Sequence, residues 1–146
     1  MIRLGVVGYG RRIHGVIEHC LRAVEPDIAV VGIVDPDEAG VRARLAPRDR
    51  DRVVFHPDLP TLVRQGHLDA LAIGTRCNLH TPYAIQAAAY DLPLFLEKPV
   101  AIDMEQARAL EQAFAGSRCQ VVVSFPLRVA PLCGLARQYL EAGSVG

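Results

Sequence analysis

The chain has 146 residues, of which 51% are hydrophobic and 22% are charged. It is therefore long enough for one domain with a buried core, and too apolar to be a disordered segment. Sixteen basic and sixteen acidic residues cancel, so no general attraction to nucleic acid is expected. No apolar run approaches the ~20 residues that span a bilayer, and the N-terminus does not resemble a signal peptide. Four widely spaced cysteines indicate reduced thiols and no metal site. We predict a cytoplasmic protein.

The first stretch predicts a strand, a tight turn and a helix. An apolar run at residues 4–7 enters Gly8-Tyr9-Gly10, and apolar residues at helical spacing follow. Gly8 permits the turn, and Gly10 lets the backbone approach a pyrophosphate. The helix would direct its unpaired N–H groups at the anion. Ile13 stands where the third glycine of the pattern belongs, so we expect this helix to pack less closely on its strand.

Strand and helix patterns then alternate to the end of the chain. Strands are predicted at residues 28–34, 53–55, 68–74, 92–96 and 121–125, and helices at about 36–46, 59–66, 81–90, 104–114 and 132–140. The last two helices have apolar stripes that we expect to face a core, and Asp103 with Gln106 predicts a capping box. The alternation predicts a three-layer α/β fold, a doubly wound parallel sheet of about six strands in the order 3-2-1-4-5-6.

Asp35 ends the second strand, 25 residues after Gly10. This is near the ~20-residue spacing of the acid that hydrogen-bonds the adenosine ribose of a dinucleotide. A helix N-cap is the alternative role for an aspartate before a proline. A carboxylate here repels a 2′-phosphate, which favours NAD. Arg11 and Arg12 keep NADP possible, because they stand where a phosphate would lie.

Glu97-Lys98-Pro99 follows the fifth strand, at the edge where open α/β sheets bind ligands. Lys98 is the only lysine of the chain, and a lysine in a fixed position can serve in proton transfer. A surface ion pair is the alternative reading of a neighbouring glutamate and lysine.

In their order and spacing these motifs resemble those of the Gfo/Idh/MocA oxidoreductases. The resemblance runs from residue 2 to the end, and its motifs are Gly8-Tyr9-Gly10, Val34-Asp35-Pro36-Asp37, residues 68–75 with Asn78 and His80, residues 96–101, Arg128, and Gly143-Ser144-Val145-Gly146.

The resemblance implies a nicotinamide cofactor across the carboxyl ends of the strands. By this resemblance Asp35 would bind the adenosine ribose, and Glu97 and Lys98 would bind the nicotinamide ribose. Thr75, Asn78 and His80 would line the path to the nicotinamide. The pyrophosphate would be held by the backbone of Gly8, Tyr9, Gly10, Arg11, Arg12 and Ile13. Lys98 would also reach the substrate hydroxyl as the catalytic residue, and Arg128 would face the substrate. The bond before Pro99 is often cis in the family. Arg76 replaces the usual proline, so it is expected to loosen its loop or touch the cofactor.

Residues 1–125 would form the dinucleotide-binding domain, and residues 126–146 a helix leading toward a substrate domain that this chain lacks. The family's catalytic histidine usually lies in that second domain, and all five histidines of the chain precede it. We therefore expect the cofactor-binding half of an NAD(P)-dependent oxidoreductase that acts on a sugar, a polyol or a related hydroxy compound, inactive by itself. The alternatives are a non-catalytic dinucleotide-sensing module and, less well supported, a methyltransferase.

Without a second domain, the last helix would expose apolar side chains, including some of Leu127, Val129, Leu132 and Leu135. Exposed apolar patches tend to find partners. We therefore expect a homo-oligomer formed through residues 125–140.

Overall fold

A computed structural model describes residues 1–144, and its centre is a six-stranded, wholly parallel sheet. The strands follow the order β3-β2-β1-β4-β5-β6, which confirms the predicted doubly wound topology. Their bounds are β1 Ile2–Val7, β2 Ile28–Val34, β3 Val54–Phe55, β4 Ala70–Ile73, β5 Leu94–Glu97 and β6 Val121–Ser124.

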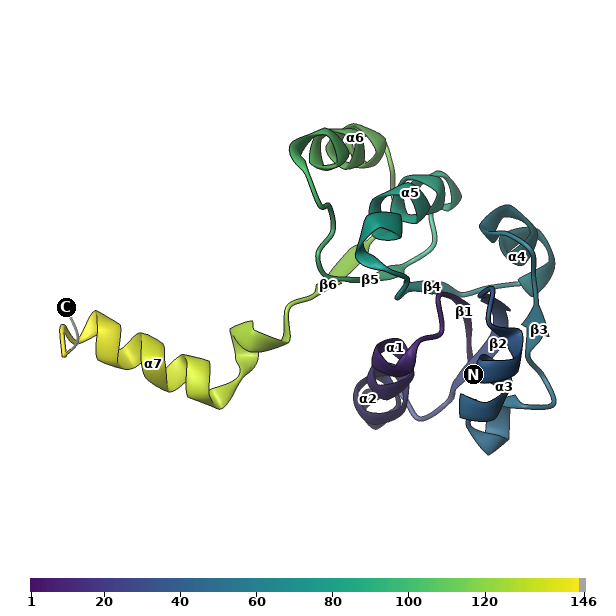
Figure 1. Ribbon diagram of the computed structural model, residues 1–146, viewed down its shortest axis with the longest axis horizontal. Coiled ribbons are helices and arrows are strands. Elements are labelled where there is room, and N and C mark those ends of the chain that lie inside the picture. The colour runs from purple at the N-terminus through teal and green to yellow at the C-terminus, as the bar shows by residue number, and fades with distance from the viewer. Residues whose placement is uncertain (145–146) are drawn as a thin grey trace.

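Helices cover both faces of the sheet, so the three predicted layers are present (Figure 1). One face bears α1 (Arg11–Val16), which continues through a π-helical segment into α2 (Arg22–Val24), and α3 (Glu38–Arg44). The opposite face bears α4 (Leu59–Gly66), α5 (Cys77–Ala87) and α6 (Met104–Ala115). Three short 3-10 turns lie at Pro47–Asp49, Ala88–Tyr90 and Pro126–Val129, and α7 (Pro131–Glu141) is the last helix.

The core has one part on each side of the sheet. Leu4 and Val6 of β1 pack with Ile13 of α1, whereas Val7 packs with Leu62 of α4 on the other side. Every residue of β2 is buried, as expected of a parallel strand covered on both faces. The sheet thus gives a rigid base to the loops at its carboxyl edge, where the chain leaves the strands.

Two helix starts show how far local patterns predicted the fold. Asp103 accepts a hydrogen bond from the Gln106 amide at 2.8 Å, as predicted, but the Gln106 side chain accepts from the Ile102 amide at 3.3 Å instead of closing a capping box. Helix α5 starts at Cys77, four residues before the predicted start. Pro82 lies inside this helix.

Helix α7 stands away from the sheet (Figure 1). Its apolar side chains are exposed, with 77% of Leu132 and 63% of Leu140 accessible. The prediction that residues 132–140 face a core is therefore wrong for this chain, because no described element covers the helix. The expected exposure of Leu127, Val129, Leu132 and Leu135 is confirmed. Val145 and Gly146, which end the last family motif, lie outside the described residues.

The α1 side of β4, β5 and β6 is also uncovered in part. An apolar hollow of about 320 Å³ lies there, with Phe95 and Val122 among its lining residues, and these two residues pair in register on neighbouring strands. Val122 is 64% exposed.

Among residues 1–144, no helix has the length and apolar character needed to cross a membrane.

Candidate functional site

The glycine turn links the end of β1 to the start of α1. Gly8 has a φ of +79°, and a Cβ at this position would lie 2.6 Å from the Thr75 Cα. Only glycine fits there, because both the backbone angle and the neighbouring backbone exclude a side chain. A Cβ on Gly10, by contrast, would meet nothing within 4 Å. Gly8 is therefore needed for the turn itself, and Gly10 leaves open space above the start of α1.

Main-chain amides face this open space. The His14 amide donates the first intrahelical bond, to the Gly10 carbonyl at 3.0 Å. The amides of Arg11, Arg12 and Ile13 precede it and have no partner within the helix, as at any helix start. Such amides, at the positive end of the helix dipole, bind anions.

Asp35 fastens the glycine turn to the end of β2. Its Oδ2 accepts from the Tyr9 amide at 2.8 Å, and its Oδ1 accepts from the Asp37 amide at 2.9 Å. Each carboxylate oxygen keeps a second lone pair, so a ribose hydroxyl can still be bound. The N-cap of α3 is Asp37, whose carboxylate accepts from the Gly40 amide at 3.0 Å. The alternative N-cap role for Asp35 is therefore wrong.

Tyr9 belongs to the core. Its side chain is fully buried, and its hydroxyl lies 3.2 Å from Nδ1 of His14. Burial, followed by the charges of Asp49 and Glu18, raises the pKa of Tyr9. Because its amide already binds Asp35 and its side chain points inward, the predicted contact between Tyr9 and a pyrophosphate is not supported by its position.

Ile13 packs directly against Gly74 at the end of β4. Ile13 is fully buried, and a Cβ on Gly74 would lie 2.6 Å from the Ile13 Cβ. In the usual pattern a third glycine in the helix allows the helix to pack closely on the strand. Here Gly74, at the end of the strand, leaves the room for that close packing. The sequence pattern could not reveal this exchange, because the two positions lie far apart in the chain.

A cleft of about 470 Å³ opens beside the turn. Its lining includes the predicted residues Gly8, Gly10, Asp35, Thr75 and Arg76, together with Val7, Val34, Pro36, Asp37, Gly74, Leu79 and Tyr83. Sequence reasoning missed both Leu79 and Tyr83. Leu79 was left outside the predicted helix, and Tyr83 was inside it but no sequence signal pointed to its place in the cleft. They stand four residues apart and therefore on one face of the helix, which gives the cleft an apolar wall suited to a flat ring.

A second group of predicted residues meets at the ends of β5 and β6. Nε of Arg12 donates to Oε1 of Glu97 at 3.0 Å, and its NH2 group lies 3.4 Å from the Ser124 hydroxyl. Glu97 is 4% exposed, whereas Lys98 beside it is exposed. The Lys98–Pro99 peptide bond is cis, as the family resemblance implied.

The position of Arg12 corrects one expectation. Asp35 follows β2, and β1 and β4 lie between β2 and β5, a separation of roughly 14 Å at the usual strand spacing. The Arg12 side chain therefore cannot offset the repulsion between Asp35 and a 2′-phosphate. Arg44 lies at that end, with its NH2 group 3.7 Å from Asp37 Oδ2 and 3.5 Å from the Tyr9 carbonyl, and Arg76 lines the cleft that contains Asp35.

His80 joins the two loops of the site. It is 2% exposed, and its ring nitrogens lie 2.8 Å from the Pro99 carbonyl and 3.0 Å from the Thr75 carbonyl. It therefore positions these loops instead of lining an open path. Asn78 is exposed on α5. Arg128 is exposed after β6, with its guanidinium 5.3 Å from the Phe125 ring centre.

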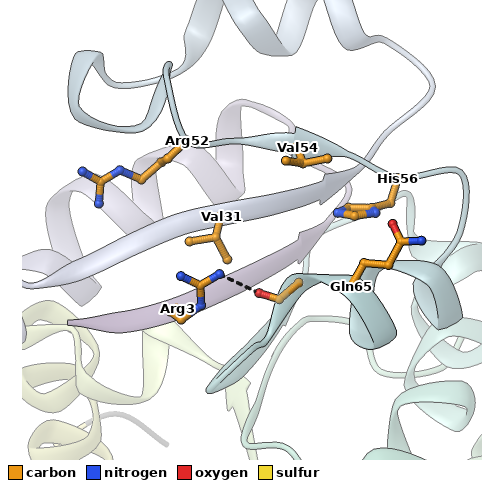
Figure 2. Close-up of a pocket in the computed structure, with 7 residues that line it drawn as sticks. Arg3, Val31, Arg52, Val54, His56 and Gln65 are labelled. Carbon is orange, nitrogen blue, oxygen red and sulfur yellow. Dashed lines mark hydrogen bonds between the residues drawn. The ribbon is translucent and has the colours of Figure 1, made fainter.

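A smaller hollow of about 250 Å³ lies beside β2, β3 and α4 (Figure 2). Arg3 borders it, and its guanidinium donates to the carbonyls of Gly66 at 2.9 Å and His67 at 2.7 Å, so it caps the end of α4. His56 and Gln65 lie together at one side of the hollow (Figure 2). We infer a structural role for these polar groups, since Arg3 already binds the carbonyls at the end of α4.

Within residues 1–144, no three His, Cys, Asp or Glu side chains gather in a way that could hold a metal ion.

The comparison with known families agrees with this geometry. The Gfo/Idh/MocA model, described as the oxidoreductase family with an NAD-binding Rossmann fold, matches residues 2–125. The chain belongs to this family. The predicted membership and the predicted cofactor, NAD, are confirmed.

This Gfo/Idh/MocA chain is similar to longer proteins. Inositol 2-dehydrogenase of Acidothermus cellulolyticus is 30% identical over 153 residues, covering 99% of the chain and 42% of the relative. Rhizopine catabolism protein MocA of Rhizobium meliloti is 26% identical over 144 residues, covering 99% and 44%. The WlbA dehydrogenase of Bordetella pertussis, solved with NADH and UDP-GlcNAcA, superimposes with a TM-score of 0.77 at 25% identity, covering 97% and 42%. The chain thus spans less than half the length of these relatives.

The residues of this Gfo/Idh/MocA domain fit a dinucleotide. Because Gly10 has no side chain, space is open above it. The amides at the start of α1 that have no partner within the helix lie next to this space. Asp35 lines the cleft, and Leu79 and Tyr83 form its apolar wall. The predicted residues thus form one group around Asp35 and a second group around Glu97.

Proposed function

We propose that this chain is the cofactor-binding half of an NAD-dependent oxidoreductase that acts on a sugar, a polyol or a related hydroxy compound. The single observation that carries the proposal is the joining of two features at one sheet edge. A glycine turn with open space over Gly10 is fastened by Asp35, and on the same edge Glu97 ends β5 and Lys98 follows it. Open α/β sheets bind ligands at this edge.

In this proposal a bound cofactor would supply a hydride acceptor, as NAD, or a hydride donor, as NADH, at C4 of its nicotinamide. Asp35 binds the adenosine ribose, and the amides at the start of α1 bind the pyrophosphate. Glu97 binds the nicotinamide ribose. Lys98 moves the proton at the substrate hydroxyl, for which its exposure at the edge is suitable. Arg128 faces the substrate.

Calorimetric titration with NAD and with NADP tests the cofactor assignment. NAD should bind more tightly, because Asp35 repels a 2′-phosphate. Gly10→Ala should abolish binding while changing the free energy of unfolding by no more than about 1 kcal/mol, the usual effect of such a change at an N-cap. Gly116→Ala is the matched control, since a Cβ there also meets nothing within 4 Å. Equal binding by the wild type and Gly10→Ala would remove the proposed pyrophosphate site.

The role of Lys98 requires a protein that carries this chain together with a substrate domain. There Lys98→Ala should lower turnover about 10²–10⁴-fold, the range for a positioned acid–base group, and should change NAD affinity much less. Unchanged turnover would overturn the assignment.

We also propose that residues 126–146 lead toward a substrate domain and that residues 125–140 mediate self-association when they are uncovered. The exposure of Phe125, Leu132 and Tyr139 supports this. Sedimentation velocity should show a dimer or larger species that Leu132→Ser weakens. Val24→Ser is the control, since Val24 is 88% exposed at another part of the surface. A monomer at all concentrations would contradict this proposal.

A cytoplasmic location remains a prediction.

A further inference from the structure

The guanidinium of Arg12 is held at the ends of two neighbouring strands. It donates to Glu97, which is almost fully buried at the end of β5, and it reaches Ser124 at the end of β6. The Arg12 side chain is nevertheless 58% exposed. A guanidinium has five N–H donors in one plane, so the donors that Glu97 and Ser124 do not use face the solvent at this edge.

Arg12 lies in the half of the site that is far from the adenosine end. The cleft beside Asp35 does not include Arg12 in its lining, and β5 and β6 lie on the other side of the glycine turn from β2. A dinucleotide with its adenosine ribose at Asp35 extends across the turn toward β5. The reacting end of the substrate then lies near Arg12 and Lys98.

Positive charge gathers at these strand ends. Lys98 follows Glu97 directly, and the Arg128 guanidinium lies over the ring of Phe125, the residue after Ser124. Three cations therefore adjoin the ends of β5 and β6, and among residues 1–144 Glu97 is the carboxylate that pairs with one of them. Asp103, the next acid along the chain, is occupied as the N-cap of α6. Side chains at these strand ends therefore carry more positive than negative charge, a balance that suits a negatively charged substrate better than a neutral polyol.

We propose that the substrate of this domain is a hydroxy compound carrying an oxyanion group, a carboxylate or a phosphate, and that Arg12 binds this group. This deepens the proposed function and rests on it. Guanidinium groups take carboxylates and phosphates through paired, charge-assisted hydrogen bonds. Glu97 fixes the plane of the Arg12 fork, so the oxyanion is bound at a defined distance from the hydroxyl that Lys98 serves. Arg12 thus determines specificity.

The test uses the chain as it is, first titrated with NADH and then, in the saturated state, with sodium gluconate, sn-glycerol 3-phosphate and myo-inositol. Binding is followed by the NMR shifts of the Ser124 and Phe125 amides. One of the two anions should bind at least roughly tenfold more tightly than inositol, the contribution of one charge-assisted pair. The tighter anion identifies the group as carboxylate or phosphate.

Arg12→Met should lower the affinity for that anion at least about tenfold. It should lower NADH affinity less, because the main-chain amide of residue 12 is kept. Arg108→Met, which removes an exposed arginine from α6, should alter neither affinity. If Arg12→Met does not fold, Arg12→Lys keeps the charge but not the planar fork and should still weaken anion binding several-fold.

Three results would overturn the proposal. The first is equal binding of inositol and the anions, or binding of none of them, while NADH binds. The second is a loss of NADH affinity in Arg12→Met with anion affinity retained, which would assign Arg12 to a cofactor phosphate. The third is failure of the wild type to bind NADH, which would remove the proposed function as well.

Discussion

The carboxylate of Asp35 accepts the amide of Tyr9 at 2.8 Å, so an acid at the end of β2 closes the turn at the end of β1. The same carboxylate also accepts the Asp37 amide at 2.9 Å. The residue expected to bind a ribose therefore also holds the glycine turn in place. Loss of Asp35 should affect stability and cofactor binding together.

Asp35→Ala should lower the free energy of unfolding by about 2–4 kcal/mol, because two amides lose a charged acceptor. Asp35→Asn keeps one acceptor oxygen and should cost roughly half as much. Asp37→Ala, which removes the α3 cap, is the comparison and should cost about 1 kcal/mol. Urea unfolding measures all three, and equal costs for Asp35→Ala and Asp37→Ala would show that the bond to Tyr9 adds nothing.

Gly8→Ala should be far more destabilising than Gly10→Ala. At Gly8 the new methyl group meets the Thr75 backbone, and the backbone angle is left-handed. Strain of this kind costs about 1–3 kcal/mol, and the steric clash adds to it, so we expect a loss of about 3 kcal/mol or more. Thermal and urea unfolding of the two variants provide the comparison. Equal stability would mean that the turn can relax around a side chain.

Gly74 and Ile13 should be coupled. Gly74→Ala should cost about 1–3 kcal/mol through overpacking against Ile13, and Ile13→Ala about 2–5 kcal/mol through a cavity. The double variant should cost less than the two losses together, by about 1–2 kcal/mol, because each change accommodates the other. A double-mutant cycle in urea measures this, and strict additivity would argue against direct packing.

Arg22 and Asp49 form an ion pair inside the domain. Asp49 is fully buried, and the NH2 group of Arg22 lies 2.8 and 2.7 Å from its two carboxylate oxygens. Arg22→Met leaves that carboxylate without its cation and should cost about 3–5 kcal/mol. Arg118→Met removes the exposed partner of Asp91 and should change little, because solvent screens such pairs. Chemical denaturation of both variants tests the contrast, and similar losses would contradict it.

His56 should make stability depend on pH. Burial lowers its pKa below the ordinary value of 6.5, so near that pH the unfolded chain binds a proton that the folded chain does not. Stability should therefore fall as the pH drops below about 6.5 toward the folded-state pKa. His56→Gln should flatten this part of the profile, whereas His19→Gln, at an exposed position, should not. Denaturation midpoints between pH 7 and 5 measure the effect, and parallel profiles for the wild type and His56→Gln would contradict it.

Local patterns determined much of this protein. The order of the elements followed from apolar periodicity, and β2 and α4 have the predicted bounds, since a strand buried on both faces and a helix with an aspartate cap are defined by neighbouring residues. The sequence also predicted the positions of Gly8 in the turn, Gly10 at the helix start and Asp35 at the strand end, because these features depend on neighbouring residues. The motifs that carried the family resemblance are of this kind.

The tertiary structure decided what depends on residues far apart in the chain. In the folded chain Arg12 contacts Glu97 and Ser124. Ile13 packs against Gly74, and Tyr9 is buried. Within residues 1–144 the tertiary structure also placed α7 away from the sheet (Figure 1). Periodicity shows which residues share a face but not which surface covers that face, and it does not show where a long side chain ends. The sequence therefore determined the glycine turn and the acid that fastens it, and only folding placed the Arg12 guanidinium at the ends of β5 and β6.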